Sequence, residues 1–245
     1  MGKFQDHFSG HASSYAAARP GYPEEMFSWL AGLCPERELA WDVATGNGQA
    51  AKMLVPYFSA VRASDASAEQ VREAPCIDGV EFCVEPAEAP GAADGSVDLV
   101  TVAQAAHWFD RDRFYEGVKR ILKPGGVLAM WCYELTTVSE DVDVLISDYY
   151  CSLDDYWPPE RKYVEDGYRS FDFPFSELEA PKFTIQCDWN VEQMLAYLQS
   201  WSATQRCWKE SGSNPIDRIR EGLVSVWGER SRPVGWPVSM RVGVM

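Results

Sequence analysis

The stretch Trp41-Asp42-Val43-Ala44-Thr45-Gly46-Asn47-Gly48-Gln49 decides the fold that this sequence of 245 residues predicts. A short apolar run, Leu39–Val43, leads into it, and apolar residues at helical spacing follow it over residues 49–58. This order predicts a strand that passes through a glycine-rich turn into a helix. Glycines in such a turn let the backbone approach a ligand closely, so we expect a ligand site at the carboxyl end of this strand.

Strand and helix patterns alternate on both sides of this turn. The expected strands lie at residues 39–43, 60–65, 80–84, 97–106, 127–133, 183–189 and 237–245, and the expected helices lie at 23–33, 49–58, 67 onward, 110–123, 191–201 and 214 onward. The early alternation is typical of a parallel, doubly wound α/β sheet. Residues 136–180 interrupt it with one helix and an aromatic, proline-containing stretch, which we expect to form an insertion over the carboxyl edge of the sheet.

The composition limits the classes of partner. The formal net charge is -15, and the sequence has no run of Lys and Arg. Nucleic-acid binders depend on neutralising phosphates, so we expect no nucleic-acid partner and no anionic membrane surface. A small anionic substrate stays possible, because it needs only one or two local Arg. No apolar run has the length of a membrane span, and no secretory signal is recognisable.

The cysteines indicate the kind of compartment. Seven Cys are scattered along the chain, and no C-x-x-C pair occurs. This usage predicts neither a metal site nor a disulfide framework, and it favours a reducing, cytoplasmic location.

The glycine turn fits two kinds of cofactor. Gly46, Gly48 and Ala51 match the dinucleotide fingerprint G-x-G-x-x-A. An acid at the end of the second strand, Asp65, suits the ribose of a dinucleotide and of S-adenosylmethionine alike. Asp42 separates the two, because it stands directly before the turn, where a carboxylate repels a pyrophosphate and attracts an ammonium and a sulfonium. We therefore expect S-adenosylmethionine, with S-adenosylhomocysteine as its product, rather than NAD.

Several motifs carry a resemblance to a known family. They are Trp41–Gln49, Asp65, Pro86-Ala87-Glu88, Gly95–Val100, His107-Trp108-Phe109, Leu122–Gly126 and the opening Phe8…Tyr15…Arg19-Pro20-x-Tyr22-Pro23. In order and spacing they resemble the class I S-adenosylmethionine-dependent methyltransferases. The opening segment and the His-Trp-Phe motif are similar to the small-molecule branch that includes trans-aconitate methyltransferase.

The resemblance implies a Rossmann-like, doubly wound sheet of seven strands in the order 3-2-1-4-5-7-6, with the last strand antiparallel. It also implies one methyltransferase domain over residues 1–245. Within it we expect an N-terminal lid at 1–35, a cofactor-binding core at 36–135, a substrate-side insertion at 136–180 and the C-terminal part of the sheet at 181–245. The oligomeric state is expected to be a monomer or a homodimer.

Ala44 departs from the family, which usually has glycine at this position. We expect a negative φ angle at Ala44, because Gly46 and Gly48 remain to supply any positive φ. A positive φ at Ala44 would cost roughly 1 kcal/mol.

The resemblance also assigns site residues. Those expected to bind the cofactor are Tyr15, Arg19, Asp42, Ala44, Gly46, Gly48, Asp65, Ala66, Ala87, Glu88, Gln104 and Ala105. Those expected near the methyl acceptor are Tyr22, Trp108, Trp131, Trp201 and Arg206, with Tyr133, Trp157 and Tyr168 as further candidates. No metal ligand is expected.

His107 is one of three His and follows the fourth expected strand. It could serve as a general base for a hydroxyl acceptor, because an unperturbed imidazole titrates near neutral pH, or it could be a structural partner of Trp108. The function expected is methyl transfer to a small molecule, a carboxylic acid or a hydroxyl compound. A non-catalytic S-adenosylmethionine-binding protein and a NAD-dependent oxidoreductase stay open as alternatives.

Overall fold

The computed structural model describes residues 21–245. The expected cofactor residues Tyr15 and Arg19, and most of the expected N-terminal lid, lie outside the described residues.

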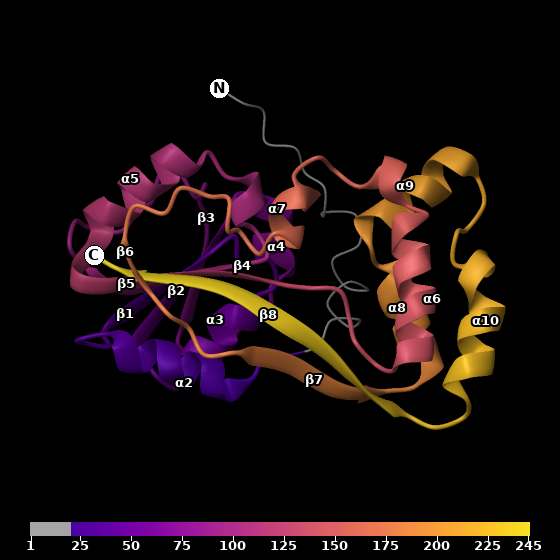
Figure 1. Cartoon of the computed structure of the whole chain (residues 1–245). Helices are drawn as coiled ribbons and strands as arrows, with labels where there is room; N and C mark the ends of the chain where they lie inside the picture. The colour runs from indigo at the N-terminus through magenta and orange to yellow at the C-terminus, as the bar shows by residue number, and fades with distance from the viewer. Residues whose placement is uncertain (1–20) are drawn as a thin grey trace.

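One mixed sheet forms the centre of the molecule (Figure 1). Its strands are β1 (Leu39–Val43), β2 (Ala60–Asp65), β3 (Val80–Val84), β4 (Val97–Ala103), β5 (Leu122–Tyr133), β6 (Ser176–Leu178), β7 (Phe183–Trp189) and β8 (Arg232–Val244). They run in the order β3-β2-β1-β4-β5-β8-β6, and β7 also pairs with β8. Only β8 is antiparallel to its neighbours in this sheet.

The expected strand order is therefore confirmed, with one difference in strand count. The position beyond β8 is shared by two strands, because β6 pairs with the end of β8 at Val242–Val244 and β7 pairs with its beginning at Arg232–Val238. The sheet thus has eight strands where seven were expected.

Helices cover both faces of the sheet. They are α2 (Glu24–Leu33), α3 (Gln49–Leu54), α4 (Ala68–Glu73), the 3-10 helix η1 (Ala106–Trp108) and α5 (Arg111–Ile121). Helices α2 and α3 share a core with one set of alternating strand residues, which includes Ala40, Leu99 and Val127. Helix α5 packs on the opposite set, which includes Trp41 and Val100.

A separate helical part stands beyond the sheet (Figure 1). It contains α6 (Glu140–Cys151), η2 (Asp154–Tyr156), α8 (Val191–Gln199), α9 (Ser202–Ser211) and α10 (Asp217–Trp227). Its own apolar core joins α6 to the later helices and to the ends of β7 and β8. The short helix α7 (Arg161–Glu165) connects back toward the sheet. The helical part thus draws on residues 191–227 as well as on the expected insertion.

Candidate functional site

The glycine turn lies at the carboxyl end of β1, as expected. Gly46 and Gly48 both have positive φ angles, 55° and 81°. A Cβ at Gly48 would lie 2.7 Å from Cζ of Phe82, so only glycine allows this close packing. A Cβ at Gly46 would meet nothing closer than Oε1 of Gln70 at 4.0 Å. The turn therefore packs tightly beneath Gly48 and leaves room above Gly46.

Ala44 does not have the negative φ that we expected, since its φ is 52°. The chain turns already at this residue, which brings the Thr45 N–H to the Ser64 carbonyl oxygen at 2.9 Å. It also lets Thr45 Oγ1 donate to Asp42 Oδ2 at 2.6 Å. An alanine in this left-handed conformation costs about 1 kcal/mol, which these two bonds help to offset.

Asp42 lies beneath the turn and is fully buried. Its Oδ1 accepts from the Thr101 hydroxyl at 2.7 Å, and its Oδ2 accepts from Thr45 and from the Ala51 N–H at 3.1 Å. Burial raises the pKa of Asp42 to about 6, against the lowering effect of these donors. The carboxylate thus shapes the turn, and because no part of it reaches the surface it could act on a ligand only through its field.

Asp65 is half-buried at the end of β2 and faces the same turn. Its Oδ2 accepts from the Gly46 N–H at 3.0 Å, and its Oδ1 accepts from the Ser67 N–H at 2.9 Å. Ala66, which lies between Asp65 and Ser67 in the sequence, is half-buried. The second strand and the glycine turn are therefore linked directly.

The loop after β3 contributes Ala87, which is buried, and Glu88, which is half-buried. Glu88 Oε1 accepts from the Asp110 N–H at 3.0 Å, ahead of α5. The loop is thus tied to the end of the sheet where the turn lies.

These features fit S-adenosylmethionine. The space above Gly46 is open to a ligand, the acid at Asp65 borders it, and the buried Asp42 supplies negative charge below. A cationic methionine part gains from that charge, whereas a pyrophosphate loses.

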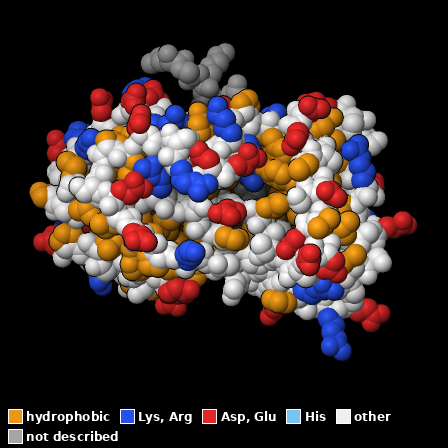
Figure 2. All heavy atoms as spheres, viewed as in Figure 1, with side chains coloured by type: hydrophobic (Ala, Val, Ile, Leu, Met, Phe, Trp, Pro, Cys, Tyr) orange, Lys and Arg blue, Asp and Glu red, His pale blue; other side chains and the backbone are white. Residues whose placement is uncertain are grey.

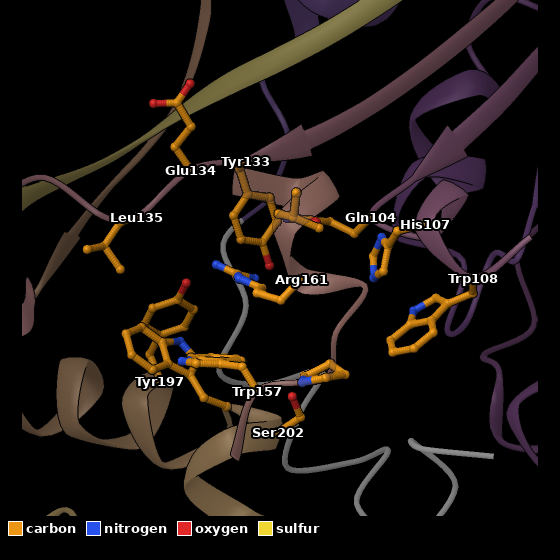
Figure 3. Close-up of a pocket in the computed structure, with 13 residues that line it drawn as sticks. Gln104, His107, Trp108, Tyr133, Glu134, Leu135, Trp157, Arg161, Tyr197 and Ser202 are labelled. Carbon is orange, nitrogen blue, oxygen red and sulfur yellow. The ribbon is translucent and has the colours of Figure 1, made fainter. Parts of the chain in front are cut away.

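A pocket lies between this edge of the sheet and the helical part (Figure 3). Hydrophobic side chains gather where the two parts meet, and acidic and basic side chains are interspersed over the rest of the face that Figure 2 shows. The residues that line the pocket are Gln104, His107, Trp108, Tyr133, Glu134, Leu135, Trp157, Pro158, Arg161, Val164, Tyr197, Trp201 and Ser202. They come from the ends of β4 and β5, from η1, from α7 and the segment leading into it, and from α8 and α9.

His107 is held by a buried tyrosine. Its Nδ1 lies 3.0 Å from Oη of Tyr168, which is fully buried. The Ala106 backbone also hydrogen-bonds the Tyr168 hydroxyl and lowers its pKa, as an N–H donor does, although burial raises that pKa overall. A hydroxyl oxygen that accepts from Ala106 has a second lone pair, so Nδ1 of His107 accepts from the Tyr168 hydroxyl or donates to it according to the tautomer of the imidazole.

Burial lowers the pKa of His107 to about 3, and the positive charge of Arg161 adds to this. A general base would need a pKa near neutral, and the pKa of His107 lies well below that. The lowered pKa makes His107 a neutral side chain, and with Nδ1 paired with Tyr168 the nitrogen left for a ligand is Nε2.

The backbone is strained at three points around the site. Within residues 21–245, the non-glycine residues with positive φ are Ala44, Gln104 and Tyr168. Ala44 begins the glycine turn, Gln104 follows β4 and lines the pocket, and Tyr168 holds His107. Non-glycine residues in the left-handed conformation cost about 1–2 kcal/mol each and gather at functional sites. Their positions therefore support a functional site around the turn and the pocket.

The structure does not bring all expected residues into the pocket. Trp131 is fully buried and packs edge-on against Tyr22 and Phe27, at 5.6 and 6.0 Å between ring centroids. Arg206 is half-buried on α9 outside the lining. Ala105 is buried at the start of η1, next to the pocket residues Gln104 and His107.

Other lining residues were not singled out from the sequence. These are Glu134, Leu135, Pro158, Arg161, Val164, Tyr197 and Ser202. Arg161 had one signal that could have found it, because it is a cation within an aromatic stretch of an acidic chain.

Two further findings concern other kinds of site. Over residues 21–245, no three His, Cys, Asp or Glu side chains are grouped so that they could hold a metal ion. None of the helices in that range is both long and apolar enough to span a bilayer.

Comparison with known proteins gives consistent matches. Residues 41–130 match the methyltransferase domain family. A methyltransferase-family protein of Dictyostelium discoideum is 35% identical over 230 residues, which cover 92% of this chain and 88% of the relative. The solved structure of a type II methyltransferase-family protein from Anaeromyxobacter dehalogenans is 41% identical with a TM-score of 0.87, covering 92% of this chain and 97% of that one. The Bacillus protein YcgJ, at 15% identity and a TM-score of 0.54, shares the fold.

Proposed function

Because the chain belongs to the methyltransferase domain family, we propose that it transfers a methyl group from S-adenosylmethionine to a small molecule held in the pocket. Membership of this family implies S-adenosylmethionine as the cofactor. We also propose that the chain belongs to the branch that includes trans-aconitate methyltransferase. It would form a single domain and be a monomer or a homodimer.

One observation carries the proposal, the position of the pocket relative to the glycine turn. Strands β1 and β4 are paired neighbours, so the turn after β1 and the pocket residues Gln104 and His107 after β4 lie at adjacent strand ends. Group transfer requires donor and acceptor side by side in a fixed orientation. The neighbouring positions of the turn and the pocket support the proposal on this ground.

The residues of the chain have mainly to position the reactants. The bound cofactor supplies a methyl group that its sulfonium already activates. Trp108, Tyr133 and Trp201 give the pocket apolar walls that exclude water and orient a flat acceptor. Asp65 would hold the ribose part from the turn side, and the buried Asp42 would favour the cationic methionine part through its charge.

His107 is proposed as a hydrogen-bond donor to the acceptor rather than as a base. We expect His107→Leu to lower kcat/KM by roughly 10-fold to 100-fold, since a hydrogen bond to a charged group is worth about 1.5–3 kcal/mol. His107→Gln, which keeps a donor, should retain more activity. With S-adenosylmethionine saturating at each pH, the rate of the unchanged enzyme should show no inflection near pH 6.5, and such an inflection that disappears in His107→Gln would restore the base role.

Transfer of a labelled methyl group from S-adenosylmethionine to a pool of small carboxylic acids and hydroxyl compounds tests the proposal. Labelled product is the expected result. Binding of S-adenosylmethionine without any transfer would instead favour a non-catalytic binding protein, and binding of NAD alone would favour an oxidoreductase.

A further inference from the structure

Charge is sparse in the pocket. Among its lining residues only Glu134 and Arg161 are charged. Glu134 accepts from the Ser239 hydroxyl at 2.8 Å, and its carboxylate points away from the other lining side chains (Figure 3). Arg161 lies in their midst, between Tyr133 and Trp157 (Figure 3). Within residues 21–245, the pocket therefore presents one cation to a ligand, Arg161.

The Arg161 guanidinium is held in place by aromatic side chains. Its Cζ lies 4.8 Å from the Trp157 ring centroid and 5.3 Å from that of Tyr150, and its Nε donates to the Tyr150 hydroxyl at 2.8 Å. Trp157 and Tyr150 pack in turn against Trp201, at 5.6 and 5.7 Å between centroids. A guanidinium fixed in this way loses little freedom when it binds a ligand.

The outer nitrogens of Arg161 have no acidic partner within residues 21–245. Glu165 belongs to the same network, because its Oε1 accepts from the Tyr150 hydroxyl at 2.5 Å. The positive charge lowers the pKa of His107, on the other side of the pocket, so its field spans the cavity. An unpaired, half-buried cation in an acidic chain calls for an anionic ligand.

We propose that the methyl acceptor carries a carboxylate bound by Arg161, joined to a flat apolar body that lies among Trp108, Tyr133 and Trp201. This rests on the proposed function and specifies its substrate class. A planar carboxylate matches the planar guanidinium fork in two parallel hydrogen bonds. Within residues 21–245, Arg161 is the one cation of the lining, which favours this monoanion over a phosphate dianion.

Calorimetric titration of the full chain saturated with S-adenosylhomocysteine tests the proposal. The probes are benzoate, phenylacetate, 3-phenylpropionate and 4-phenylbutyrate, each with its neutral amide, and phenyl phosphate. We expect at least one carboxylate to bind ten times more tightly than its amide. Arg161→Gln should reduce that preference to less than threefold, and Arg161→Lys should keep part of it. Arg220→Gln makes the same charge change in an exposed ion pair on α10 and should leave the preference intact.

Three outcomes would overturn the proposal. One is that no carboxylate is preferred over its amide, or that phenyl phosphate binds more tightly than every carboxylate. Another is that Arg161→Gln leaves the preference unchanged. The third is that Arg161→Gln weakens S-adenosylhomocysteine as much as the acid, because Arg161 would then serve the carboxylate of the cofactor. Binding of S-adenosylhomocysteine to the unchanged chain separates these from a failure of the proposed function, and its retention in Arg161→Gln shows that the variant is folded.

Discussion

Ala44 shows at the residue scale what the sequence could and could not settle. The glycines of the turn indicated that some of its residues have positive φ. That Ala44 is one of them depends on the contacts of Thr45 with β2 and Asp42. These contacts are tertiary, so no local pattern reports them. Arg161 and Tyr168 were likewise recognisable as an unusual cation and an aromatic residue, yet their roles depend on which strand ends they face.

Replacing Ala44 by glycine should stabilise the chain. Glycine adopts a φ of 52° without strain, so Ala44→Gly should raise the free energy of unfolding by up to about 1 kcal/mol. Ala196→Gly, at an exposed position within α8, is the matched control and should lower it by about 1 kcal/mol. Urea unfolding of both variants gives the comparison, and losses of equal size would contradict the strain at Ala44.

Asp42 should make cofactor binding depend on pH. Its pKa of about 6 in the free chain is raised, and a bound cation favours the ionised carboxylate and lowers that pKa. Affinity for S-adenosylmethionine should therefore rise between pH 5 and 7 and level off above pH 7. The rise should be about tenfold for each unit by which the bound cofactor lowers the pKa of Asp42. His107, with a pKa of about 3, does not titrate in this range.

Calorimetric titration across this pH range measures the effect. The rise should disappear in Asp42→Asn, whatever its absolute affinity. A constant affinity of the unchanged chain from pH 5 to 7 would show that the field of Asp42 does not reach the cofactor.

At the scale of elements, prediction succeeded where local signals were strong. Strand β1 and helices α5 and α8 were expected at residues 39–43, 110–123 and 191–201, and the structure has them at Leu39–Val43, Arg111–Ile121 and Val191–Gln199. Helix α3 ends at Leu54 rather than residue 58, because Pro56 lacks the N–H that would continue it. Helix α9 was missed, since it buries only Ala203, Thr204 and Cys207 and has no clear apolar stripe.

The start of α8 supports the pocket, since this helix carries Tyr197 and leads into Trp201. The Asn190 side chain accepts from the Gln193 N–H at 3.0 Å, and the Gln193 side chain accepts from the Asn190 N–H at 2.9 Å. Asn190→Ala should lower the free energy of unfolding by about 1 kcal/mol, and Asn190→Ser should restore most of it. Thermal unfolding followed by circular dichroism provides the measurement, and equal stability of the alanine and serine variants would argue against the cap.

For the whole molecule, strand alternation and the motif resemblance predicted the order of the sheet, because parallel strands with helical crossovers allow few topologies. The helical part was harder to foresee. It is assembled from α6 and from α8 to α10, which a pair of strand segments separates in the sequence but which share one core. The pocket proposed for the acceptor lies where this part meets the sheet, so its lining could only be found from the structure.

The central claim is that this sheet holds S-adenosylmethionine at the glycine turn and not a dinucleotide. Isothermal titration of the full chain at neutral pH with S-adenosylmethionine, S-adenosylhomocysteine and NAD tests it most directly. The account predicts saturable binding of the first two, markedly weakened in Asp42→Ala, and no binding of NAD. Binding of NAD without binding of either S-adenosyl compound would contradict it.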